Sequence, residues 1–296
     1  MSDKYVANIS LQEVPHLSKK DKDSLGSILL TSDEWEARID GVPAGIKTKP
    51  EITALSDSEL LDLAQALQVL DEKYKYCKQE FIFPKYLKTP GYKKHLLFMK
   101  AGSVYKERAL IAGNRTGKTY TATLEMSFHL NGRYPKGWEG KEFRHPIKAW
   151  EIGKTHETTA QILQTYLLGN RYDLGTGFIP KEDIVRVTSK PGVPDGIQTA
   201  HIKHYTDGKY DGISEVNFKS YIQGVEAFMG DQVHVIHLDE EPDSRSIYSE
   251  CLTRTMTTEG IIICTFTPIL GLSEVVLSFL PNGQFPPGGI GCVDSK

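Results

Sequence analysis

One eight-residue segment, AGNRTGKT at positions 112–119, constrains this chain more than any other part of its sequence. It follows a short apolar run, ALIA at 109–112, which predicts a buried strand. It precedes YTATLEMSFHL at 120–130, which predicts a helix. A glycine-containing loop between a strand and a helix is typical of phosphate binding, because the first amides of the helix point at the anion.

The residue types in this loop suit a nucleoside triphosphate. Gly117 permits the backbone turn, Lys118 can reach the β- and γ-phosphates, and the Thr119 hydroxyl can ligate Mg²⁺. The usual pattern G-x-x-x-x-G-K-[ST] has Gly where this chain has Ala112. We predict contacts with the nucleotide along the whole loop, from Gly113, Asn114, Arg115, Thr116, Gly117, Lys118 and Thr119.

A second apolar run ends in a cluster of acidic residues. VHVIHL at 233–238 predicts a core strand, and DEEPD follows it directly. In a phosphate-loop enzyme, an Asp at this place holds Mg²⁺ and a neighbouring Glu activates the attacking water. We assign these roles to Asp239 and Glu240. Successive strand residues face opposite sides, so the alternation must break here. A solvated acidic turn is the alternative.

A third apolar run, IIICTFTP at 261–268, also closes in polar residues. In helicase- and translocase-type ATPases, a polar residue on the strand beside the metal-binding strand senses the γ-phosphate. Thr265 and Thr267 are the candidates for this coupling role. The alternative is a threonine-rich strand end before a proline stop.

Strands alternate with helices over most of the chain, which predicts an α/β fold with a mostly parallel central sheet and helices on both faces. Ser56 and Glu59 have capping-box spacing, so a helical N-terminal extension should begin there and run to about residue 80. Residues 1–50 are weakly patterned. The remaining predicted elements are a strand at 148–153, a helix at 157–168 and a hairpin at 201–221.

The composition is that of an ordinary globular protein, with 296 residues, 39% of them apolar, and a net charge of -3. This excludes a uniformly basic nucleic-acid binder. Residues 71–108 nevertheless carry ten Lys/Arg against four Asp/Glu, interleaved with aromatic residues. Such a face could contact a phosphate backbone. The alternative is a solvated surface whose aromatic side chains pack inward.

Other kinds of site have little support in the sequence. The four cysteines lack C-x-x-C spacing, so no zinc site or disulfide framework is expected. The histidine pairs His201/His204 and His234/His237 are three residues apart, which places the two rings on opposite faces of a strand. No signal peptide and no membrane-spanning apolar run is present, so we expect a soluble intracellular protein.

Taken in this order, the motifs resemble the ATPase domain of the large terminase subunit, the genome-packaging motor of tailed bacteriophages. AGNRTGKT is similar to that family's modified phosphate loop. The segments at 129–143, 220–243 and 253–276 resemble, respectively, the stretch after the loop, the approach to the carboxylates and the coupling motif Thr-x-Thr-Pro.

The resemblance implies a RecA-like P-loop NTPase of the ASCE class that uses ATP and Mg²⁺ to drive double-stranded viral DNA into a procapsid. It implies a portal protein and a small terminase subunit as partners, a pentameric ring on the portal, and the cytoplasm of the infected host as location. The family's adenine contact precedes the loop, usually as a Gln after an aromatic residue. Tyr92 or His95 stands there in this chain.

The resemblance also suggests a division of the chain. We expect an N-terminal arm and helical segment over 1–80, the ATPase domain over 81–280 and the start of a linker over 281–296. The family's nuclease domain would require a longer chain. Arg115 is the first candidate for the arginine that stabilises transition-state charge, and Arg254 or Arg245 the second.

Two alternatives remain. A helicase would share the loop and the Asp-Glu pair, but it needs a second RecA-like domain, for which there is no room after residue 280. A nucleotide-dependent assembly module would tolerate the loss of Glu240.

Overall fold

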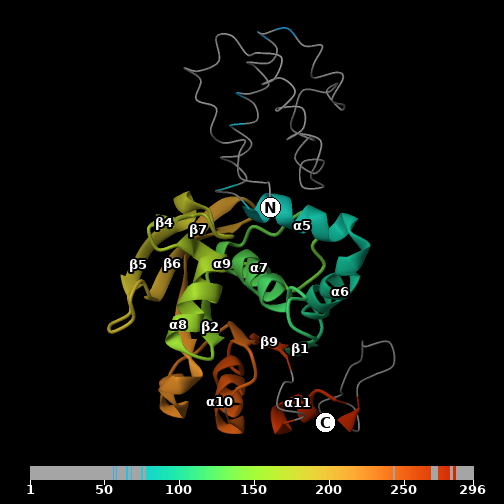
Figure 1. Ribbon diagram of the computed structural model, residues 1–296, viewed down its shortest axis with the longest axis vertical. Coiled ribbons are helices and arrows are strands. Elements are labelled where there is room, and N and C mark those ends of the chain that lie inside the picture. The colour runs from blue at the N-terminus through green and yellow to red at the C-terminus, as the bar shows by residue number, and fades with distance from the viewer. Residues whose placement is uncertain are drawn as a thin grey trace. The chain divides into compact units, whose positions relative to one another are not determined.

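The computed structural model describes residues 78–242, 244–267, 273–280 and 283–284, together with five isolated earlier positions. The chain divides into two compact units, Met1–Phe81 and Ile82–Lys296, and the fold described below is that of the second (Figure 1). The first 50 residues and most of the predicted helix at 57–80 lie outside the described residues. Four isolated positions within that range are helical: Ser58, Gln65, Gln68 and Lys75.

A seven-stranded sheet in the order β1-β9-β8-β2-β7-β6-β5 organises the second unit. Its first five strands run parallel, and β6 and β5 are antiparallel additions at one edge. The predicted mostly parallel sheet is therefore correct. The strand bounds are β1 (Glu107–Ile111), β2 (Lys148–Gly153), β5 (Ile184–Ser189), β6 (Ile197–Thr206), β7 (Lys209–Ser220), β8 (Val235–Asp239) and β9 (Ile261–Phe266).

Most strands lie where the sequence predicts them: β2 matches its predicted bounds residue for residue, and β9 lies within the predicted run at 261–268. The predicted hairpin is β6–β7, and its turn residues Asp207 and Gly208 have φ angles of 51° and 76°, which is the primed turn that suits strand twist. β5 was not predicted, because a register shift after Ile184 interrupts its alternation. A further two-stranded sheet pairs β3 (Gly169–Asn170) with β4 (Asp173–Leu174).

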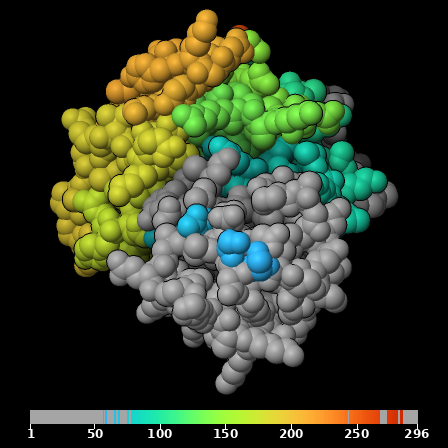
Figure 2. Space-filling model, turned by 90° about the horizontal axis from the view of Figure 1, so that it is seen from above, coloured from blue at the N-terminus to red at the C-terminus, as the bar shows by residue number. Residues whose placement is uncertain are grey.

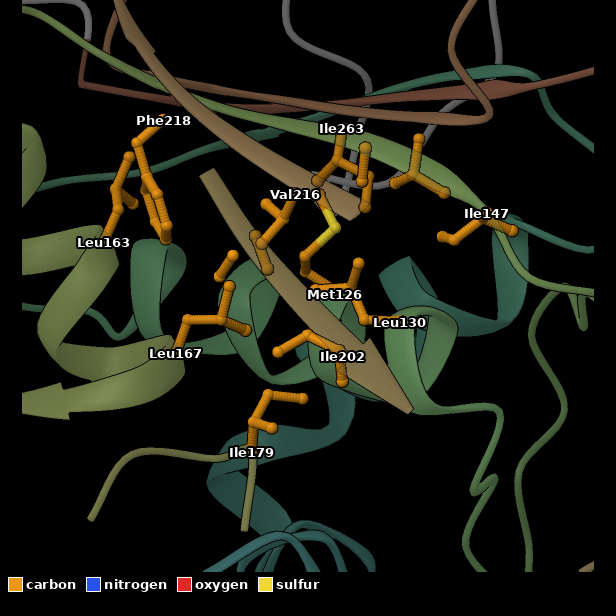
Figure 3. Packing of buried hydrophobic residues seen from close by; sticks show 14 of the residues in the cluster. Met126, Leu130, Ile147, Leu163, Leu167, Ile179, Ile202, Val216, Phe218 and Ile263 are labelled. Carbon is orange, nitrogen blue, oxygen red and sulfur yellow. The ribbon is translucent and has the colours of Figure 1, made fainter. Parts of the chain in front are cut away.

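Helices cover both faces of the main sheet, as predicted. On one face, α7 (Lys118–Asn131) packs with a continuous run of α8 (His156–Thr158), the π-helical η5 (Thr159–Gln164) and α9 (Thr165–Leu168). Figure 3 shows Met126 and Leu130 of α7 among the sheet residues Val216, Ile202 and Ile263. On the other face, α10 (Arg245–Thr255) and α11 (Glu274–Ser278) cover a second core.

The segment before the sheet folds as α5 (Lys78–Lys88), η4 (Pro90–Tyr92) and α6 (Lys93–Ala101). α5 was not predicted beyond residue 80, since Pro84 inside it normally ends a helix. Phe83, Tyr86 and Met99 pack against Leu124 and Phe128 of α7. These aromatic side chains therefore pack inward, which was the alternative expectation for this segment. α7 is buried on nearly all sides, because it lies between the sheet and these helices.

Short 3-10 turns complete the unit: η6 (Lys181–Asp183), η7 (Tyr221–Gln223) and η8 (Val225–Phe228). Figure 2 shows the segment after α7, in green, beside the segment around β5 and β6, in yellow. Arg133 joins the two by donating to the buried carboxylate of Asp183 at 3.0 Å. Within the part of the chain that is described, no helix is long and apolar enough to cross a membrane.

Candidate active site

The order of the parallel strands brings the predicted residues to one edge of the sheet. β9 lies between β1, which leads into the phosphate loop, and β8, which ends at Asp239. All three run in the same direction, so their carboxyl ends meet at that edge. Asp239 is the register partner of Thr265. The loop, the carboxylates and the threonines thus lie around the end of one central strand.

The phosphate loop turns sharply into α7. Arg115 and Gly117 have φ angles of 61° and 82°, and Gly117 is the N-cap of the helix. The left-handed backbone at Arg115 costs about 1 to 2 kcal/mol, whereas glycine adopts it freely. Asn114 and Arg115 are exposed, and Arg115 forms no hydrogen bond or ion pair with any other described residue. The Thr116 hydroxyl closes the turn on the Gly113 carbonyl at 3.0 Å.

Lys118 links the loop to the neighbouring strand. Its Nζ donates to the Gly113 carbonyl and to the Thr267 hydroxyl, each at 2.8 Å. Burial lowers the pKa of Lys118, and the nearby carboxylates of Glu240 and Asp239 only partly oppose this. The ammonium group is therefore held where phosphate oxygens would meet it.

Thr119 and Asp239 meet although 120 residues separate them. The Thr119 hydroxyl donates to Asp239 Oδ1 at 2.7 Å, and the Asp239 side chain is largely buried. Hydroxyl and carboxylate oxygens are hard ligands, and Mg²⁺ usually takes one or two of them and completes its shell with water and phosphate. This donor set fits Mg²⁺. Among the described residues, no group of three or more His, Cys, Asp or Glu side chains could hold a metal.

Glu240 breaks the alternation of β8. Its φ angle is 61°, a left-handed conformation that is uncommon for a residue with a side chain. The turn is held by its own amide, which donates to the Thr265 carbonyl at 2.9 Å. The Tyr221 hydroxyl donates to the Glu240 carbonyl at 2.9 Å, and the Asp239 carbonyl lies 3.3 Å from the same oxygen. The strand alternation of β8 therefore ends between Asp239 and Glu240.

The electrostatics of Glu240 suit a base. Burial and the adjacent charge of Asp239 raise the pKa of Glu240, while a hydrogen bond from the Thr267 amide, Lys118 and Lys154 hold it down in part. A carboxylate whose pKa is raised accepts a proton more readily near neutral pH.

Sequence reasoning missed a buried polar row beside Asp239. His237 Nδ1 lies 2.6 Å from Glu151 Oε2, and His237 Nε2 lies 2.8 Å from the Thr265 hydroxyl. Thr265 in turn donates to Asp239 Oδ1 at 2.7 Å. The lone Glu151 inside the apolar strand KAWEIG was the available signal, since a buried carboxylate demands a partner. Tyr221 left no such signal.

The chain shares its motifs with known proteins. The family model described as "Terminase large subunit, T4likevirus-type, N-terminal" matches residues 109–288. The chain is 40% identical over 244 residues to the large terminase subunit of Salmonella phage P22, covering 77% of this chain and 47% of that protein. This chain belongs to the terminase large-subunit family. It spans about half the length of the P22 protein.

A solved structure of this family is also similar to the chain. The ATPase domain of the Thermus phage P74-26 large terminase is 16% identical, with a TM-score of 0.42, and the match covers 64% of this chain and 73% of that one.

Tyr92 and His95 lie at different distances from the loop of this terminase chain. His95 Nε2 donates to the Thr116 carbonyl at 2.8 Å. Tyr92 stacks on Tyr86 with ring centroids 4.3 Å apart, and the Tyr86 hydroxyl lies 2.9 Å from the Thr121 hydroxyl of α7. His95 thus contacts the phosphate loop directly, whereas Tyr92 contacts the rings of Tyr86 and His95.

The candidate arginines of the terminase chain also differ in position. Arg245 begins α10, five residues after Glu240, and forms an exposed ion pair with Glu274 at 3.2 Å. Arg254 lies in the last turn of the same helix, and its carbonyl accepts from the Val233 amide just before β8 begins. Within one chain, Arg115 and Arg245 therefore lie at the edge that holds the carboxylates, and Arg254 lies at the opposite edge.

Proposed function

We propose that residues 81–280 form the ATPase domain of a viral DNA-packaging motor, which hydrolyses ATP to move double-stranded DNA into a procapsid. The observation that carries this proposal is the convergence of Lys118, Thr119, Asp239 and Glu240 at one sheet edge, in a chain of the terminase large-subunit family. Fold alone would not assign a function, because function depends on the site.

In this proposal the loop from Gly113 to Thr119 receives the phosphates at the amino end of α7. Lys118 turns from Gly113 and Thr267 to the β- and γ-phosphate oxygens. Thr119 and Asp239 would hold Mg²⁺, which neutralises phosphate charge when bound. His95 or Tyr92 contacts the adenine, and the contact of His95 with Thr116 favours His95.

Glu240 is the proposed general base. Its left-handed backbone ends the strand alternation of β8, and its raised pKa suits the removal of a proton from water. Arg115 is the first candidate for stabilising the transition state in cis, because it is exposed in the loop itself. Arg245 is the second within the same chain, and Arg254 would act only on a neighbouring subunit.

Thr265 and Thr267 are the proposed coupling residues. Thr267 accepts a hydrogen bond from Lys118, and Thr265 donates to Asp239. Phosphate that recruits Lys118 therefore frees the Thr267 hydroxyl, and loss of phosphate restores the bond. β9 would pass this change to the segment that follows it.

The partners follow from the family and are part of the same proposal. They are double-stranded viral DNA, the portal of the procapsid, the small terminase subunit and a pentameric ring of copies of this chain, all in the host cytoplasm. A nuclease domain would belong to a longer chain, joined through a linker that begins at 281–296.

Substitution of Glu240 tests the proposal. We expect Glu240→Gln to keep ATP binding and to lower turnover at least about 100-fold, since a positioned base contributes that much. Glu241→Gln, one residue further on, is the matched control and should retain turnover. Normal hydrolysis by Glu240→Gln would refute the assignment of Glu240 as the base, whereas nucleotide binding without hydrolysis by the unsubstituted chain would favour an assembly module.

Substitution of Lys118 tests the loop separately. Lys118→Ala should weaken binding of ATP measured by fluorescence titration, because the loop loses its only buried ammonium group among the described residues. Unchanged affinity would contradict the loop assignment. DNA-stimulated hydrolysis without strand separation would distinguish a packaging motor from a helicase.

A further inference from the structure

A row of polar side chains crosses three neighbouring strands behind the proposed Mg²⁺ ligand. Glu151 of β2, His237 of β8 and Thr265 of β9 are all fully buried. Glu151 and His237 are register partners, and so are Asp239 and Thr265. The row lies on the face of the sheet that α7 covers. Ala149, Val235 and Ile263, each two positions earlier on its strand, belong to the apolar core on that face.

The contacts of Thr265 determine which atoms donate and which accept at the Asp239 end of this row. The Thr265 hydroxyl has a single proton, which it donates to Asp239 Oδ1 at 2.7 Å. Its contact of 2.8 Å with His237 Nε2 must then be one that it accepts. His237 therefore carries a proton on Nε2 and turns Nδ1 toward Glu151 at 2.6 Å.

Glu151 has a clear effect on this arrangement. Its Oε2 lies 2.6 Å from His237 Nδ1, a separation at which the two atoms share a hydrogen-bonding proton. With Nδ1 occupied in this way, the ring cannot rotate to present another nitrogen to Thr265.

Asp239 receives two hydroxyl protons on the same oxygen, from Thr119 and from Thr265. Thr119 is itself a proposed metal ligand, whereas Thr265 is a donor that is not proposed to bind the metal. A carboxylate fixed through Oδ1 in this way presents Oδ2 in one orientation.

We propose that Glu151, His237 and Thr265 are positioning residues that orient the Asp239 carboxylate for Mg²⁺. This rests on the proposed function, in which Asp239 holds the metal. Partners behind a metal ligand commonly contribute 10- to 100-fold to metal affinity, because they fix the ligand before the metal arrives.

The first test uses two substitutions at Thr265. Thr265→Val keeps the side-chain shape but removes the hydroxyl, and Thr265→Ser keeps the hydroxyl. We expect Thr265→Val to weaken Mn²⁺ binding in the presence of ATP, measured by electron paramagnetic resonance, by about 10- to 100-fold. Thr265→Ser should stay within about threefold of the wild type. Nucleotide binding in excess EDTA should be the same for both.

A matched control is available in α7. Thr123 is also fully buried, and its hydroxyl has no hydrogen-bond partner among the described residues. Thr123→Val should leave the Mn²⁺ affinity unchanged. If Thr123→Val weakened Mn²⁺ binding as much as Thr265→Val does, the effect would be one of core packing and the proposal would be wrong.

A second test measures the unsubstituted protein in the absence of metal. The imidazole ¹⁵N chemical shifts of His237 should report a protonated Nε2, assigned by loss of the signals in His237→Gln. A bare Nε2 would overturn the proposal, even if Thr265→Val failed to fold.

Asp239→Asn separates the two levels of the argument. If it abolishes Mn²⁺ binding while Thr265→Val binds normally, the positioning role is wrong and the proposed function stands. If Asp239→Asn itself binds Mn²⁺ and hydrolyses ATP normally, the proposed function fails.

Discussion

Two buried Glu–His pairs lie in this unit, and they behave differently because of their third partner. In α7, Glu125 lies 3.3 Å from His129 and also accepts a two-pronged ion pair from Arg108, whose closest contact is 2.7 Å. In the sheet, no arginine among the described residues pairs with Glu151 or His237, and hydrogen bonds connect this pair through Thr265 to Asp239. Arg108 completes the first pair, whereas hydrogen bonds link the second pair to the site residue Asp239.

The difference appears in the pKa directions. Burial alone would raise the pKa of Glu125, but Arg108 and His129 lower it, so this carboxylate stays charged. Burial lowers the pKa of His129 and keeps that ring neutral. For His237 the direction is reversed, because Glu151 raises its pKa. The same two residue types thus give a structural ion pair in one place and an oriented hydrogen-bond chain in the other.

Removing Arg108 should have the largest effect on stability. Arg108 is buried and also donates to the Phe98 carbonyl at 2.7 Å, so Arg108→Met strands the charge of Glu125. We expect a loss of about 3 to 5 kcal/mol in the free energy of unfolding, measured by urea denaturation. Arg144→Met, in an exposed pair with Asp207, should cost less than about 1 kcal/mol. If Arg108→Met cost no more than Arg144→Met, the ion pair of Arg108 with Glu125 would not have the structural role described.

Neutralising each glutamate should sharpen the contrast. Glu125→Gln leaves the Arg108 charge buried without its carboxylate, so we expect a loss of about 3 kcal/mol. Glu151→Gln strands no arginine and leaves an amide that can still donate to His237 Nδ1, so about 1 kcal/mol is expected. Urea unfolding of both variants at pH 7.5 measures the difference. Equal losses would mean that both pairs are held together mainly by charge.

The smallest effect concerns pH. The folded pKa of His129 is lowered, so its contribution to stability is present above the unfolded value of about 6.5 and is lost as pH falls through the folded pKa. The folded pKa of His237 is raised, so its contribution is present below about 6.5 and is lost as pH rises through the folded pKa.

Substitution of each histidine should therefore change the pH dependence in opposite directions. Between pH 7.5 and 5.5, His129→Gln should reduce the acid loss of unfolding free energy, and the double substitution Glu151→Gln/His237→Gln, which leaves no buried carboxylate behind, should increase it, each by about 1 kcal/mol. A change of the same sign in both variants would show that the two pairs do not differ in proton binding.

The sequence allowed the edge of the sheet to be predicted better than its interior. Lys118, Thr119 and Asp239 each follow or end an apolar run, and parallel strands bring such positions together wherever the runs pair. The mostly parallel sheet was predictable for the same reason, since its buried strands are continuous apolar runs.

Contacts across the strands could not be predicted from the sequence. Glu151 and His237 meet only because β2 and β8 are neighbours in one particular register, and a shift by one residue would turn them to opposite faces. The hydrogen bond from the Tyr221 hydroxyl to the Glu240 carbonyl depends on where the turn after β7 lies in space. The inward packing of Phe83 and Tyr86 depends on α7 being covered on its outer side.

The left-handed backbone at Glu240 has a practical consequence for the choice of inactive variants. Glycine would remove the carboxylate and also release the backbone, so Asp239 next to it could move as well. Valine or isoleucine would resist the φ angle that the turn demands. Glutamine alters the charge and leaves the backbone preference nearly as it was. Only that last substitution isolates the chemistry of position 240 from the geometry of its neighbour.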